Sequence, residues 1–209
     1  MNTMLKKEMR LSALLLTYLF IGFGVMTLVP GYPILCGAFF ITLGIFQSFQ
    51  SAREANDIVF SALLPIAKRD VVKGKYQFTA FIELAGFAVM AVLTLVRMTV
   101  LADAVIYRQN TLMNANLFFL GCVLLIFGLF NAIFLGGFLK TAYKLGKYFV
   151  IFIAVCFVVI FLAEAAHHVP GLGELNAFGF DHIGLQLLTL LAGAAAFPTD
   201  ASIYPSVIA

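Results

Sequence analysis

The residues of this chain that could do chemistry are few, and the most suggestive group lies near the end of an apolar segment. Glu164, His167 and His168 stand at positions i, i+3 and i+4, so they share one face of a helix. Imidazole and carboxylate groups at such a spacing can bind zinc, and His182 follows across a short loop. A polar exit from a helix explains the same residues, so we predict no metal site. No Ser-His-Asp, Cys-His or paired-carboxylate arrangement is present, and we predict no catalytic residue.

A phosphate-binding loop of the form Gly-x-x-x-x-Gly-Lys-Ser/Thr is also absent from the sequence. The nearest approximation, Gly136–Thr141 (GGFLKT), has the wrong spacing and lies at the end of an apolar segment. We therefore predict that the chain is not an enzyme by itself and binds no cofactor. If ATP drives its activity, a separate partner must bind the ATP and its Mg²⁺ ion.

Glu83 is the most unusual ionisable residue, because it stands inside an apolar segment, seven residues after Tyr76. At 1.5 Å per helical residue it lies roughly 10 Å into the membrane, where a charged carboxylate costs about 2.5–3.5 kcal/mol or more. Three interpretations remain open: the side chain lines a path for a cationic or amphipathic substrate, bonds to a neighbouring helix, or couples to protons. Asn131 in a later segment is predicted to bond between helices and, with Glu83, is a candidate for the substrate path. Arg97, about 21 Å further along the helix, is predicted to reach the lipid headgroups.

The elements that position these residues must be membrane helices. Hydrophobic residues make up 63% of the chain and charged residues 11%, against about 25% charged residues in soluble domains. The apolar runs are continuous rather than alternating, which excludes a β-barrel. We predict an all-α membrane protein with a single domain of six spans, preceded by an interfacial helix at residues 1–10. The predicted spans cover residues 11–29, 34–49, 77–101, 117–139, 148–166 and 183–201.

Basic residues predict the orientation of these spans. If the N-terminus is cytoplasmic, every Lys and Arg except Arg97 and Arg108 faces the cytoplasm. The loop at residues 50–76 then becomes the first cytoplasmic loop and the most charged stretch of the chain. Within it Ala52, Ala55, Val59, Leu63 and Ile66 recur at helical spacing, which predicts an amphipathic helix. Such a helix could lie on anionic lipid headgroups or bind a protein partner.

The same loop resembles the first cytoplasmic loop of type 2 ABC transporter permeases. The similar residues are Asp57-Ile58-Val59, Leu64-Pro65-Ile66, Arg69, Val72 and Lys75-Tyr76. The closest subgroup is the short six-span kind that is encoded beside a separate ATPase and includes bacterial exporters of antimicrobial and amphipathic peptides. The resemblance also covers the layout of most of the chain, including a membrane-surface helix near Met4–Arg10.

The resemblance implies that the loop forms coupling helices that seat in a groove of the ATPase. The residues expected to contact the ATPase are Asp57, Ile58, Phe60, Leu63, Leu64, Pro65, Ile66 and Arg69. The expected partners are an ABC ATPase, a second copy of the chain or a related permease, the lipid bilayer and an amphipathic or antimicrobial peptide, with no nucleic acid. The expected location is the bacterial plasma membrane.

Two other functions compete with this interpretation. A secondary transporter could use Glu83 as a proton or cation site, and would be expected to show two repeated halves. We find no such symmetry between residues 1–105 and 106–209. A membrane scaffold without transport activity would have no need of an amphipathic cytoplasmic helix.

Overall fold

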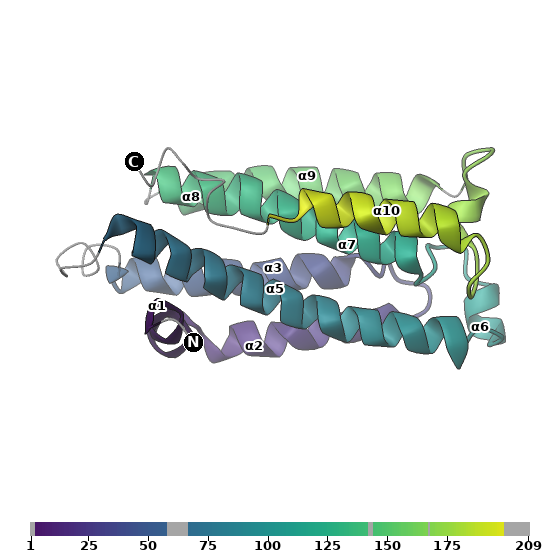
Figure 1. Cartoon of the computed structure of the whole chain (residues 1–209), viewed down its shortest axis with the longest axis horizontal. Coiled ribbons are helices and arrows are strands. Elements are labelled where there is room, and N and C mark those ends of the chain that lie inside the picture. The colour runs from purple at the N-terminus through teal and green to yellow at the C-terminus, as the bar shows by residue number, and fades with distance from the viewer. Residues whose placement is uncertain (1–2, 58–66, 142–143, 167, 199–209) are drawn as a thin grey trace.

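The computed structural model describes residues 3–57, 67–141, 144–166 and 168–198, and every regular element among them is helical (Figure 1). The all-α prediction is therefore confirmed for these residues. The longer helices lie side by side along the long axis of the molecule. One end of this bundle holds α1 (Thr3–Lys7), the end of α3 (Cys36–Glu54) and the start of α5 (Lys68–Thr99). We call it the basic end, and α6 (Val105–Arg108) lies at the opposite end.

The N-terminal segment is sharply bent. The helix formed by α1 and η1 (Glu8–Ser12) meets the helix formed by α2 (Leu15–Ile21) and η2 (Gly22–Leu28) at 98°. An extended link separates the two, and the freed N–H of Leu14 donates to Ser48 Oγ of α3 at 2.9 Å. Thr17 Oγ1 lies 2.6 Å from the same Ser48 Oγ and donates to the Gly44 carbonyl. These bonds satisfy the backbone at the bend and hold α2 against α3.

The remaining elements complete the bundle. Residues 117–141 run through α7 (Leu117–Leu129), the wider π-helical turn η3 (Phe130–Leu135) and α8 (Gly136–Thr141). They are followed by α9 (Leu145–Ala166), the short η4 (Gly173–Asn176) and α10 (Ile183–Ala196).

Three helices of the described residues are long and apolar enough to cross a membrane: α5, the run from Leu117 to Thr141, and α9. Counting the bent N-terminal pair as one span raises the number to four. Helix covers most of the described part of each predicted span, but α3 is not among these candidate spans and α10 has only 14 residues. Length and composition thus identify a multi-pass membrane protein without fixing six crossings.

Helix continues into the predicted 50–76 loop from both sides. Helix α3 continues to Glu54, and α5 begins at Lys68, so residues 50–54 and 68–76 are helical. The sequence prediction ended the spans where polar residues began.

Phenylalanine rings fill the interior between the helices. Phe78, Phe119, Phe127, Phe130, Phe134 and Phe152 are among the largest fully buried side chains. The Phe46 ring of α3 stacks on Phe149 of α9 with centroids 3.8 Å apart, and Phe134 meets both. These rings stabilise packing within one subunit.

Glycine allows α7 and α10 to approach backbone to backbone. A Cβ atom placed on Gly121 would lie 2.5 Å from the Thr189 carbonyl oxygen, and one on Gly193 would overlap the Gly121 carbonyl. Gly128 similarly faces the Ala196 carbonyl. Gly121 and Gly128 of α7 thus serve contact with α10 inside the subunit.

Candidate coupling site at the basic end

Four charged side chains form a closed ring of ion pairs at the basic end, which we call the ion cluster: Lys7, Glu8, Asp57 and Lys75. Lys7 Nζ lies 2.5 Å from Asp57 Oδ1 and 3.3 Å from Glu8 Oε1. Lys75 Nζ lies 2.9 Å from Asp57 Oδ2 and 3.3 Å from Glu8 Oε2. Each cation thus contacts both anions. The cluster joins three segments that are distant in sequence: the N-terminal helix, the chain after α3, and the first turns of α5.

The ion cluster is shielded from solvent. The side chains of Glu8 and Lys75 are 4% and 3% exposed, and those of Asp57 and Lys7 are 12% and 18% exposed. The Lys75 ammonium also lies 5.6 Å from the centre of the Phe49 ring. Removing one member of such a group would leave a buried charge without its partner, which is strongly destabilising.

The local sequence explains how Asp57 reaches this position. Helix α3 ends at Glu54, and Asn56 adopts a left-handed conformation with φ 54°. Asparagine is one of the few residues other than glycine that tolerates this conformation after a helix. The N–H groups of Ala55 and Asn56 donate to carbonyls of the last turn of α3, so the chain folds back and the Asp57 side chain turns toward the N-terminal helix.

The pKa of the Asp57 carboxyl reflects these contacts. Burial alone would raise the pKa, but Lys75 and Lys7 outweigh the burial and hold the pKa below its usual value. Burial likewise acts to lower the pKa of the Lys7 ammonium, and the carboxylates of Asp57 and Glu8 raise it above its usual value. Both groups are therefore more firmly charged than in a free chain.

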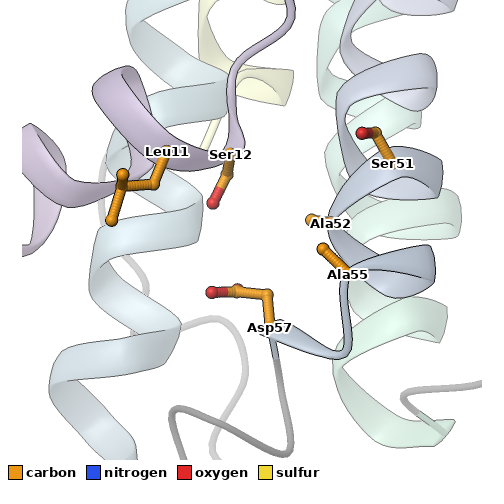
Figure 2. A pocket seen from close by; sticks show the side chains of 6 residues that line it. All are labelled: Leu11, Ser12, Ser51, Ala52, Ala55 and Asp57. Carbon is orange, nitrogen blue, oxygen red and sulfur yellow. The ribbon is translucent and has the colours of Figure 1, made fainter.

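A small cavity of about 160 Å³ lies beside the ion cluster, between η1 and the end of α3. Figure 2 shows the Asp57 carboxylate pointing across this space from the end of α3, with Ser12 on the facing segment. The other lining residues are Leu11, Ser51, Ala52 and Ala55. The small side chains of α3 leave room here for a few water molecules, and the cavity lacks the apolar enclosure typical of a substrate site.

Only part of the predicted ATPase contact lies within the described residues. Asp57 belongs to the ion cluster, and Arg69 is exposed in the first turn of α5. The residues Ile58, Phe60, Leu63, Leu64, Pro65 and Ile66 lie outside the described residues. Lys7, Glu8 and Lys75 of the ion cluster were not among the predicted functional residues. One feature of the sequence could have indicated them: the predicted topology places acidic and basic residues of distant segments at the same end of the bundle.

Glu83 and Asn131 are brought together in the interior. The Asn131 amide donates to Glu83 Oε2 at 2.7 Å and to the Phe127 carbonyl at 2.9 Å, and both residues are fully buried. The bond joins α5 to the η3 turn, as expected for polar residues inside a membrane bundle. The two residues face each other within one subunit in this conformation, and their assignment to a substrate path stays a prediction.

Arg97 lies elsewhere than predicted. Its side chain is not at the lipid headgroups: the residue is 4% exposed, and its guanidinium donates to the Thr27 carbonyl and to Asn114 Oδ1, both at 2.8 Å. The guanidinium also lies 4.1 Å from the centre of the Tyr107 ring. The prediction was wrong because the acceptors come from the end of η2 and from the segment before α7, which fold over this end of α5. They satisfy the guanidinium internally.

Comparison with known proteins identifies the family. The family described as ABC-2 family transporter protein matches residues 3–207. The chain belongs to this family. It is a membrane permease subunit of an ABC transporter, and its family implies a partner ATPase. No curated protein and no solved structure matches the chain.

Proposed function

We propose that this permease is the membrane subunit of an ATP-driven exporter with six spans and a cytoplasmic N-terminus in the bacterial plasma membrane. A separate ATPase seats on the segment from Asp57 to Ile66 and on Arg69. Two permease subunits form the path, and closure of the ATPase subunits on ATP shifts the bundle between access states. The proposed substrate is an amphipathic or antimicrobial peptide, which rests on the resemblance to peptide exporters.

The observation that carries this proposal is the ion cluster. Asp57 is the first residue of the proposed ATPase contact, and its carboxylate is bonded to Lys7 and Lys75. A displacement of this segment is therefore passed to the N-terminal helix and to α5. Helix α5 is 32 residues long and reaches the opposite end of the bundle. A permease that receives force from an ATPase on one side of the membrane requires a long helix bonded to the contact segment.

The exposed start of α5 adds a second argument. Lys68 and Arg69 are exposed in its first turn, although the N-terminus of a helix carries a partial positive charge and disfavours basic residues. They contribute nothing favourable to their own helix. An acidic surface on the ATPase would neutralise these two positive charges, which supports Arg69 as a contact residue.

The N-terminal bend supports the proposed orientation. A helix that meets the next at 98° can lie along the membrane surface while the next one crosses. Lys6 and Arg10 are exposed on it, as in a helix that lies at anionic headgroups. The ion cluster would then lie at the cytoplasmic surface, which is the side on which an ATPase must bind.

The test is co-purification of the permease with the ATPase encoded beside it. Leu63→Asp is expected to abolish stoichiometric recovery of the ATPase, because a charge would be buried in the proposed contact. Val105→Asp makes the same change at an exposed position of α6, at the opposite end, and is expected to leave recovery unchanged. Full recovery with the Leu63 variant would contradict the proposed contact.

A further inference from the structure

The carboxyl group of Glu83 is enclosed in the middle of the bundle. Its relative exposure is 0%, as is that of Asn131, whose amide donates to Glu83 Oε2. The bond connects α5 with the η3 turn, where the helix between α7 and α8 widens by one residue. Asn131 also donates to the Phe127 carbonyl four residues earlier, so the amide is fixed while it bonds to the acid.

No countercharge lies near this carboxyl group among the described residues. The elements packed against α5 at this depth are α2, η2, α3, α7 and η3, and residues 15–28, 36–52 and 117–135 contain no charged residue. Tyr18, Cys36 and Cys122 are the ionisable groups within these ranges. The cations on α5 are distant, with Lys75 about 12 Å and Arg97 about 21 Å along the helix. Both cations are already bound, Lys75 in the ion cluster and Arg97 at the opposite end.

The second carboxyl oxygen of Glu83 receives no hydrogen bond from the described part of the chain. Glu83 Oε1 is fully buried and has no hydrogen-bond partner among the described residues. Thr79 Oγ1, one helical turn earlier on the same face, is also buried without a hydrogen-bond partner among these residues. An ionised carboxylate accepts hydrogen bonds through both oxygens, whereas a protonated carboxylic acid has one O–H donor and accepts fewer hydrogen bonds. Within the described residues, a single amide donor to Oε2, a buried Oε1 that accepts no hydrogen bond and the lack of a nearby cation suit the protonated form.

From this arrangement we propose that Glu83 is a proton-binding site inside the membrane domain and carries its proton in this conformation. The proton resides on Oε1, while Oε2 accepts from Asn131. The neutral acid then fastens α5 to η3 with a hydrogen bond that requires no countercharge. Loss of the proton would leave a charge in an apolar interior, so this packing of α5 on η3 depends on the bound proton.

Infrared spectroscopy of the purified permease in lipid at neutral pH tests the proposal directly. We expect a carbonyl-stretch band of a protonated carboxylic acid, and we expect Glu83→Gln to abolish it. Glu174→Gln changes an exposed carboxylate at the opposite end and is expected to leave the band intact. A missing band in the wild-type protein, or a band that survives Glu83→Gln, would overturn the proposal.

Thermal unfolding supplies an independent readout. Glutamine has the shape and the hydrogen-bonding groups of a protonated glutamate, so Glu83→Gln is expected to keep the melting temperature of the wild type. Glu83→Leu is expected to lower it, because the Asn131 amide loses its acceptor. A Glu83→Gln protein that unfolds early or fails to fold would contradict a neutral acid at this position. Neither measurement needs the ATPase, so the outcome is independent of the proposed function.

Discussion

At the scale of single residues, the ion cluster illustrates how buried charge can hold segments together. Lys7 and Asp57 are 50 residues apart in sequence, and Glu8 and Lys75 are 67 apart. Replacing one member leaves the others desolvated without full compensation, so the penalty exceeds that for an exposed ion pair. The cluster therefore stabilises the position of Asp57 against the N-terminal helix and α5.

The lowered pKa of Asp57 predicts how stability responds to acid. A carboxyl whose pKa is lower in the folded state stabilises the protein above its unfolded pKa of about 3.9, and this contribution is lost as pH falls through the folded value. At neutral pH, Asp57→Asn is expected to cost about 1.5–3 kcal/mol, as for a hydrogen bond to a charged group. Below about pH 4 the difference between variant and wild type should shrink.

Unfolding in mixed micelles as a function of pH measures this effect. Asp70→Asn provides the matched control, because Asp70 is an exposed acid in the first turn of α5. An Asp57→Asn protein that is as stable as the wild type at neutral pH would show that the ion cluster contributes nothing to the fold.

At the scale of the helices, the contact between α7 and α10 depends on glycine. Gly193→Ala places a methyl group against the Gly121 carbonyl, and backbone cannot move aside as a side chain can. We expect a loss of about 1–3 kcal/mol, the usual cost of overpacking. Gly184 lies on the same helix with nothing within 4 Å of an added Cβ. Gly184→Ala should be neutral or stabilising, since alanine favours helix by roughly 0.5–1 kcal/mol over glycine.

Melting temperatures of the two alanine variants give the measurement. Gly193→Ala is expected to lower the melting temperature, and Gly184→Ala is expected to keep or raise it. Equal effects would mean that the two helices do not pack as closely as described.

The helices also show what could be predicted from sequence. The continuous apolar runs predicted helix in all six segments, because run length and hydropathy are local properties. Glu83 and Asn131 were each singled out as polar residues in apolar surroundings, but nothing local indicated that they bond to each other. Arg97 was misplaced because its acceptors, the Thr27 carbonyl and the Asn114 side chain, come from segments without a regular pattern.

At the scale of the whole molecule, the two ends of the bundle differ in chemistry. The basic end gathers the ion cluster and the exposed cations of α5, while the opposite end closes over Arg97 with Asn114 and Tyr107. The charge bias along the sequence predicted this division. The partners inside each end could not be predicted, since they depend on how α1, α3 and α5 pack. Force applied at the basic end would reach the opposite end through α5.

Site-specific photo-crosslinking in intact membranes tests the central claim most directly. A photoreactive amino acid at position 63 is expected to crosslink to the ATPase encoded beside the permease. Mass spectrometry would identify the captured protein by its phosphate-binding loop. The same amino acid at position 105, on α6 at the opposite end, is expected to capture no ATPase. Capture of the ATPase from position 105, or from neither position, would contradict the account.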